Sequence, residues 1–197
     1  MNLPGVYKVF NDKWKDFQTC WIISDTHFGD EELAAGHPGR PNGADLVKMI
    51  NSKVGRKDVL IHLGDVGNPE IAKQLRGYKV LVMGNHDAGR TNYEDIFDEI
   101  YEGPVMLGEK LLLSHELIQI PWAFNLHGHD HQGKHLHKGG MNVCIDADGM
   151  GYFPINLNQA LKTGLLSKIE SIHRTTIDKA TDRKKKRGGK KIGEKNK

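Results

Sequence analysis

Six short apolar runs, each followed by polar residues or turns, constrain the fold of this chain more than any other feature. They read TCWIIS, DVLIHLG, KVLVMG, KLLLS, FNLHG and MNVCID, over residues 19–24, 58–64, 79–84, 110–114, 124–128 and 141–146. Runs of this length that are rich in Val, Ile and Leu are typical of buried strands. Helical patterns lie between and after them, over residues 44–54, 68–76, 91–100 and 158–172. This alternation predicts an α/β sandwich or layered sheet.

Length and composition favour one domain inside the cell. The chain has 197 residues, of which 38% are apolar and 23 are glycine, and this is enough for one domain with a core. No apolar run reaches the roughly 18 residues that span a membrane, and the N-terminus lacks a signal-peptide pattern. Cys20 and Cys144 both fall in predicted strands. We therefore expect buried free thiols, no membrane contact and a cytoplasmic location.

The charge is distributed unevenly along the chain. Residues 179–197 hold ten Lys and Arg against two acids, a net charge of +8, so the remainder of the +3 chain carries −5. We predict one domain over 1–175 and a basic, disordered tail over 176–197. Such a tail binds nucleic acid through phosphate contacts or is a solubilising end without a specific partner. It has no aromatic residues to stack on bases.

Chemically active side chains follow five of the predicted strands. They are Asp25, His27, Asp65, Asn85, His115, His129 and His131. Sites in open α/β sheets form at the carboxyl ends of strands, so five strand ends can converge on one cleft. The mixed nitrogen and oxygen set suits Mn, Fe, Zn, Co or Ni. Seven ligands exceed what one ion needs, which predicts two divalent ions about 3.5–4 Å apart.

The same residues form a recognisable series of motifs. The blocks Asp25-Thr26-His27, Gly64-Asp65, Gly84-Asn85-His86-Asp87, His115 and Gly128-His129-Asp130-His131 occur in this order over residues 25–131. Together they resemble the calcineurin-like metallophosphoesterase superfamily. The resemblance implies a two-layer β-sandwich flanked by helices, in four αββα layers.

The resemblance also implies a role for each matched position. Asp25, His27 and His131 would hold one metal, Asn85, His115 and His129 would hold the other, and Asp65 would bridge them. A hydroxide between the metals would attack phosphorus. The predicted catalytic residues are His86, as general acid or transition-state donor, and Asp87, in a supporting position.

The chain departs from the protein Ser/Thr phosphatases of the superfamily. The segment after Gly64-Asp65 has no Asp-Arg pair, and Asp87 stands where those enzymes have Glu. The chain is most similar to the small stand-alone members of prokaryotic or phage type. Two loop cations, Arg40 and Arg90, are predicted to bind substrate, with solvated loop charges as the alternative. His62, inside a predicted strand, is interpreted as a core histidine.

We therefore predict a phosphodiesterase with two divalent ions, Mn first, then Fe, Zn, Ni or Co. The alternatives are a phosphomonoesterase acting on nucleotides or small molecules and a catalytically silent, metal-bound interaction module. The expected partner is a phosphoester substrate, with nucleotides or nucleic acid as candidates because of the basic tail. The sequence leaves the oligomeric state open.

Overall fold

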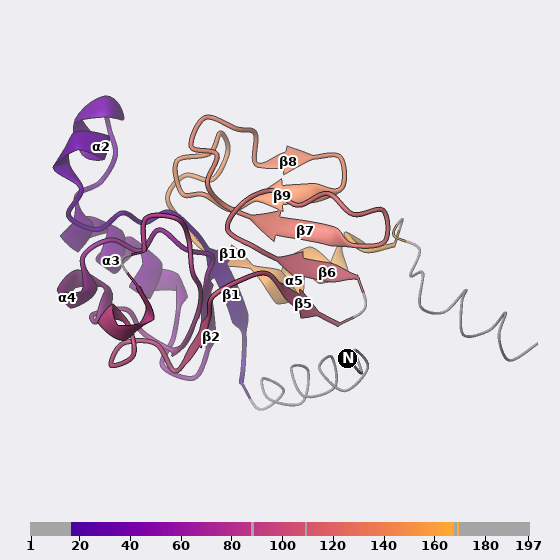
Figure 1. The fold of residues 1–197 in the computed structure, drawn as a ribbon, viewed down its shortest axis with the longest axis horizontal. Coiled ribbons are helices and arrows are strands. Elements are labelled where there is room, and N and C mark those ends of the chain that lie inside the picture. The colour runs from indigo at the N-terminus through magenta and orange to yellow at the C-terminus, as the bar shows by residue number, and fades with distance from the viewer. Residues whose placement is uncertain (1–16, 88, 109, 168, 170–197) are drawn as a thin grey trace, which may run out of the picture.

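Two β-sheets lie face to face in the computed structural model of this protein (Figure 1). The structure describes residues 17–87, 89–108, 110–167 and 169. In this part of the chain each sheet has five strands, in the orders β10-β1-β2-β3-β4 and β5-β6-β7-β9-β8. The predicted β-sandwich flanked by helices is confirmed.

The first sheet is mainly parallel. Its strands are β1 (Cys20–Ile23), β2 (Val59–His62), β3 (Tyr78–Val82), β4 (Glu99–Tyr101) and β10 (Ile155–Asn156). The strands β1 to β4 run parallel, and β10 closes one edge antiparallel to β1. Because β1, β2 and β3 run parallel, the residues that follow them lie at one edge of the sheet.

The second sheet combines a parallel centre with antiparallel edges. Its strands are β5 (Val105–Leu107), β6 (Leu111–Leu113), β7 (Phe124–His127), β8 (Leu136–His137) and β9 (Gly140–Asn142). The strands β6, β7 and β9 run parallel, whereas β5 and β8 pair antiparallel with their neighbours. The carboxyl ends of β6 and β7 therefore also lie at a common edge.

Alternating side chains of the first sheet separate the core into two layers. Ile22 and Ile61 belong to the cluster shared with the second sheet, whereas Ile23, Leu60 and Leu81 belong to the cluster shared with the helices. This alternation is expected because successive side chains of a strand point to opposite faces. Each fully buried aliphatic side chain contributes roughly 1.5–3 kcal/mol to stability.

Short helices complete the structure. They are α2 (Glu31–Gly36), α3 (Gly43–Lys53), α4 (Pro69–Ala72), the 3-10 turn η1 (Arg90–Asn92) and α5 (Leu157–Lys162). The helix α3 buries Leu46, Val47 and Ile50 against the first sheet. Its N-terminus is capped by Asn42, whose side-chain oxygen accepts a hydrogen bond from the Asp45 N–H. The helix α5 contacts β1 and β10.

The helix predicted over residues 91–100 is wrong. This segment forms η1, turns and then β4, which pairs with β3. Tyr93, Ile96 and Phe97 are buried at a spacing that suits a helix face, but sheet pairing determines the conformation of the residues after them.

Other predictions have partial outcomes. The helix predicted over 158–172 begins at Leu157, and part of that range lies outside the described residues. The boundary near residue 175 and the tail 176–197 also lie outside them. Across the residues that the structure describes, no helix is long and apolar enough to cross a membrane.

Candidate metal centre

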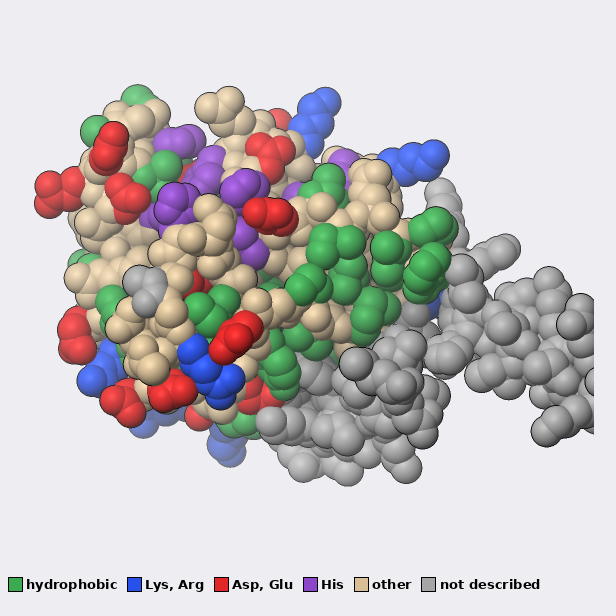
Figure 2. Space-filling view, viewed as in Figure 1, with side chains coloured by type: hydrophobic (Ala, Val, Ile, Leu, Met, Phe, Trp, Pro, Cys, Tyr) green, Lys and Arg blue, Asp and Glu red, His purple; other side chains and the backbone are tan. Residues whose placement is uncertain are grey.

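The strand ends of both sheets bring the predicted ligands to one edge of the molecule. In the first sheet, Asp25 and His27 follow β1, Asp65 follows β2, and Asn85 follows β3. In the second sheet, His115 follows β6, and His129 and His131 follow β7. Histidine side chains accordingly gather in one patch on this face (Figure 2). The structure thus brings all seven predicted ligands into one region.

Four of these ligands have a backbone conformation that L-residues seldom adopt. The φ angles are 60° at Asp25, 38° at His27, 56° at Asp65 and 68° at His129. Such conformations cost of order 1–3 kcal/mol each and persist only when the surrounding structure holds them. Hydrogen bonds at the edge do this: the His129 N–H donates to both carboxylate oxygens of Asp25, at 3.1 and 3.0 Å.

Asp65 lies at the centre of the cluster. Its Oδ1 accepts a hydrogen bond of 2.9 Å from the His86 N–H. Its Oδ2 lies 3.4 Å from His27 Nε2 and 3.3 Å from His115 Nε2. Burial alone favours the neutral acid, but these two imidazoles and the His86 N–H outweigh it and lower the pKa of Asp65. Asp65 is therefore a buried carboxylate between two imidazole nitrogens.

On one side of Asp65, three ligand atoms converge. Asn85 Oδ1 lies 2.8 Å from His115 Nε2 and 3.1 Å from His129 Nδ1, and these two nitrogens are 3.1 Å apart. His115 Nδ1 lies 2.8 Å from the Leu63 carbonyl oxygen. Because a carbonyl only accepts, Nδ1 carries a proton. Nε2 is therefore the ring nitrogen that faces Asn85 and Asp65.

On the other side of Asp65 lie Asp25, His27 and His131. Ligand atoms of Asp25, His27 and Asp65 all fall within 4.8 Å of one another, and His131 Nε2 is 3.7 Å from Asp25 Oδ1. The Cys144 thiol also lies near Asp25 and His131. Burial raises the pKa of the Cys144 thiol strongly, so the metal-free protein has a neutral thiol beside the carboxylate.

Two glycines let the loops approach this closely. A Cβ atom at Gly84 would collide with Asp65 Oδ1, and one at Gly128 would collide with Ser24 Oγ and Asp25 Oδ2. The contacted atoms belong to the candidate ligands Asp65 and Asp25 or to a buried serine beside them. A side chain at either position would displace a candidate ligand, so the glycines in these motifs are needed for packing.

The chemistry of the donor set fits divalent cations. His27 Nε2 is buried and has no hydrogen-bond partner among the described residues, although it faces Asp65. A buried polar atom without a partner is rare and costly. A cation between the imidazole and the carboxylate would satisfy both. Asp25, His27 and Asp65 on one side, and Asp65, His115 and His129 on the other, are each close enough to share an ion.

The two predicted catalytic residues have different surroundings. His86 is exposed and lines a cleft of about 570 Å³ beside the ligands. Asp87 instead accepts hydrogen bonds from the backbone N–H groups of Asp65, Val66 and Gly84, at 3.0, 2.9 and 2.8 Å. Asp87 therefore ties the end of β2 to the end of β3. Its assignment as a catalytic residue stays a prediction.

The two predicted substrate-binding arginines do not line this cleft. Arg40 has only 3% of its side chain exposed and pairs with Asp146, whose side chain is 1% exposed. Arg90 pairs with Glu94 at 3.0 Å and lines a separate surface depression. Both guanidinium groups are thus engaged elsewhere, which differs from the role that the sequence suggested.

Sequence reasoning missed two residues of this region, Asp146 and His37. Asp146 Oδ2 lies 2.8 Å from His131 Nδ1, and its contact with Arg40 spans 106 positions, so no local pattern indicates it. His37 lines the cleft, with its ring centroid 5.9 Å from that of His131. One signal was present: Asp30 followed by two glutamates predicts a helix start, and α2, capped by Asp30, leads to His37.

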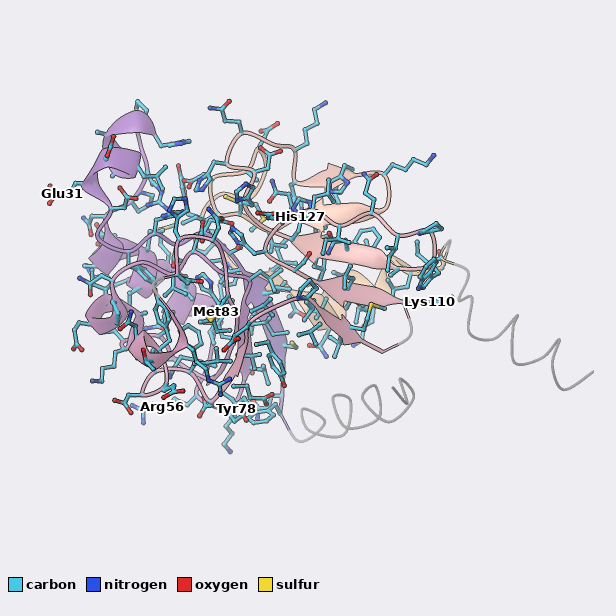
Figure 3. All side chains as sticks on the ribbon, in the orientation of Figure 1. Glu31, Arg56, Tyr78, Met83, Lys110 and His127 are labelled. Atoms are coloured by element: carbon cyan, nitrogen blue, oxygen red, sulfur yellow. The ribbon has the colours of Figure 1, made fainter. Side chains whose placement is uncertain are left out.

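His127, at the end of β7 in Figure 3, takes a structural position. It is buried, and its Nε2 lies 2.7 Å from His137 Nε2. Its Nδ1 lies 2.8 Å from the Gly128 carbonyl oxygen. Both ring nitrogens therefore contact neighbouring protein groups. The histidine cluster of residues 127–131 thus combines one packing residue with two candidate ligands.

His62 is a core histidine, as predicted, and makes stability depend on pH. Its Nε2 lies 2.9 Å from Thr26 Oγ1, and burial lowers its pKa from 6.5 to about 4. In the unfolded chain His62 is protonated below about pH 6.5, whereas in the folded protein it is protonated only below about pH 4. We expect this group to remove about 3 kcal/mol of unfolding free energy as the pH falls through that window.

Urea unfolding at pH 7 and pH 4 tests this expectation. Other histidines also titrate, so the wild type is compared with His62→Gln, whose amide N–H can replace the bond to Thr26. The variant should lose about 3 kcal/mol less than the wild type between the two pH values. Equal losses in the two proteins would contradict the role of His62.

The fold and the site define a class of protein. Its two sheets carry candidate ligands for divalent metals at their strand ends, where a phosphoester can bind. The sequence profile of calcineurin-like phosphoesterases matches residues 19–138. The chain belongs to this family, and it is a metal-dependent phosphoesterase.

Two further comparisons are informative. A crystal structure of a protein of unknown function, AQ665 from Aquifex aeolicus, superposes with a TM-score of 0.61 and 26% identity, over 74% of this chain and 98% of that one. No curated protein matches the sequence.

Proposed function

We propose that this protein hydrolyses phosphodiesters at a centre of two divalent cations. The observation that carries the proposal is the position of Asp65 Oδ2, 3.4 Å from His27 Nε2 and 3.3 Å from His115 Nε2. One carboxylate oxygen that faces two sets of ligands is the arrangement expected of a bridging ligand. Asp25, His27 and His131 form one set, and Asn85, His115 and His129 form the other.

The bound cations would lower the pKa of a water held at the site and offset negative charge on the phosphate oxygens. The chain supplies the rest of the chemistry. The exposed ring of His86 stands at the cleft, where a protonated imidazole can give its proton to the leaving alcohol oxygen. The His86 N–H holds Asp65 Oδ1, so the same residue orients the bridging carboxylate through its backbone.

The charge of the cleft favours a diester over a monoester. Asp30 and Glu32 line it together with His37 and the ligands, and no described Lys or Arg does so. Near neutral pH a monoester approaches two negative charges, whereas a diester has one. Nearby carboxylates repel the additional charge, and neither Arg40 nor Arg90 is placed to offset it. A monoester would therefore need the cations, or a protonated imidazole such as that of His86, to offset its second charge.

The finer predictions follow from the donor set and the composition. We propose Mn²⁺ as the first metal to test, with Fe, Zn, Ni and Co as alternatives, because the ligands are imidazole, carboxylate and amide groups. We also propose a cytoplasmic location, since Cys20 and Cys144 are both free thiols. Nucleotides and nucleic acid stay candidate substrates because of the basic residues 179–197.

Steady-state hydrolysis by the full-length protein tests the proposal. The metal-stripped protein is loaded with Mn²⁺ and assayed with bis-p-nitrophenyl phosphate and with p-nitrophenyl phosphate. We expect kcat/KM to be at least about tenfold higher for the diester, and both activities to vanish without metal. Faster hydrolysis of the monoester would favour the phosphomonoesterase. A protein that binds two ions and hydrolyses neither substrate would favour the interaction module.

A further inference from the structure

A buried carboxylate lies directly behind one candidate metal ligand. Asp146 Oδ2 is 2.8 Å from His131 Nδ1, and 19% of the His131 side chain is exposed. Asp146 is also paired with Arg40, so it is a carboxylate that only accepts hydrogen bonds. His131 Nδ1 must therefore donate. This fixes the tautomer that leaves a lone pair on Nε2, the atom on the side of Asp25.

Arg40 extends this contact to a second ligand segment. Its Nε donates to Asp146 Oδ1 at 2.9 Å and to Oδ2 at 3.2 Å. Its Nη2 donates to the carbonyl oxygens of Asp25 and Thr26, at 3.0 Å each. One guanidinium group thus joins the loop after β1 to the segment after β9. The planar fork of arginine suits this task, whereas lysine has a single charged atom.

The segment that Arg40 holds is strained. Asp25 and His27 have positive φ angles of 60° and 38°, and both are candidate ligands of the same ion as His131. Their carboxylate and imidazole point correctly only while the backbone keeps this conformation. Two of the acceptors bound by Arg40 are carbonyls within that strained segment, so Arg40 supports it where support is needed.

A buried ion pair is an expensive way to join two loops. Removing two charges from water costs several kcal/mol per ion, and apolar side chains of similar volume often stabilise a fold as well or better. Both side chains here are almost fully buried. The hydrogen bonds of this pair reach the candidate ligand His131 and the loop that carries Asp25 and His27. They indicate that the pair orients these groups.

We propose that Asp146 and Arg40 are positioning residues that orient His131 and the loop of residues 25–27 for the cation bound on that side of Asp65. Carboxylates behind metal-bound histidines generally orient the ring and increase its basicity, and their loss weakens metal binding about 10–100-fold. The proposal rests on the proposed function, because it requires the metal centre.

The substitution Asp146→Asn tests the pair with little change in shape. If the amide oxygen stays with Arg40, the amide N–H₂ faces His131 Nδ1. The imidazole proton must then move to Nε2, where it blocks the lone pair that a cation needs. Asp148→Asn is the matched control, because Asp148 is an exposed acid two residues further along the chain.

The experiment is titration of metal-stripped, full-length protein with Mn²⁺ by calorimetry. We expect Asp146→Asn to weaken one of two binding steps by about 10–100-fold and to leave the other within about twofold. Asp148→Asn should bind as the wild type does. Thermal unfolding of the metal-free proteins shows that each variant is folded. Arg40→Lys, which loses the planar guanidinium group, should weaken the same binding step.

A double-mutant cycle separates positioning from general stability. If Asp146 acts through His131, Asp146→Asn should add little to the weakened binding of His131→Ala, but should keep its full effect in His115→Ala. Equal effects in both backgrounds, or unchanged binding by Asp146→Asn, would overturn the inference while the proposed function stands. A wild type that binds no Mn²⁺ would overturn both.

Discussion

The substitution Asp65→Asn should abolish hydrolysis and remove one of two bound metal ions. The Oδ2 atom of Asp65 faces both His27 and His115, and the amide would present either a weaker oxygen or an N–H₂ group there. A bridging charge contributes several kcal/mol to the bound state and to the transition state. We expect kcat/KM for bis-p-nitrophenyl phosphate to fall by about 10³-fold or more.

Metal content and activity are measured on the same sample. The purified variant is loaded with Mn²⁺, desalted and analysed for metal before the assay. Asp95→Asn is the control, since Asp95 is an exposed acid outside the cleft. Retention of two ions with near-normal activity in Asp65→Asn would show that Asp65 is not the bridge and would remove the main support for a dinuclear centre.

The sheets of this protein could be predicted because their central strands are buried on both faces. All four residues of β2 and of β7 are buried, and such strands appear in the sequence as continuous apolar runs. The edge strands β8 and β10 have two residues each and no fully buried ones. Their pairing depends on neighbours that are distant in sequence, so a local pattern does not identify them.

The positions of the candidate ligands could be predicted because each follows a strand that the pattern identifies. Parallel strands place their carboxyl ends at one edge, so Asp25, Asp65 and Asn85 converge once the strands are placed. The roles of Arg40 and Asp146 could not be predicted in this way. Both lie in loops, and only the folded chain joins them across 106 positions. A loop arginine after a metal motif resembles a phosphate ligand until its partner is known.

The substitution His86→Ala should slow hydrolysis by about 10²–10⁴-fold while both metal ions stay bound. The ring lines the cleft, with its centroid 5.5 Å from that of His27. The contact with Asp65 is made by the backbone N–H of residue 86, so alanine preserves it. The substitution thus removes the exposed imidazole and leaves the Asp65 carboxylate in place, and kcat should fall much more than KM changes.

The leaving group shows whether His86 donates a proton. p-Nitrophenolate leaves readily without protonation, whereas an alkyl alkoxide needs a proton, so the loss in His86→Ala should be larger for a diester with an alkyl leaving group. His37→Ala is the control, because His37 lines the same cleft without belonging to the motifs; we expect it to lose less than about tenfold. Equal losses for both leaving groups would assign His86 to binding the phosphate. A hydrogen bond from the imidazole to a phosphate oxygen has the same effect whichever alcohol leaves.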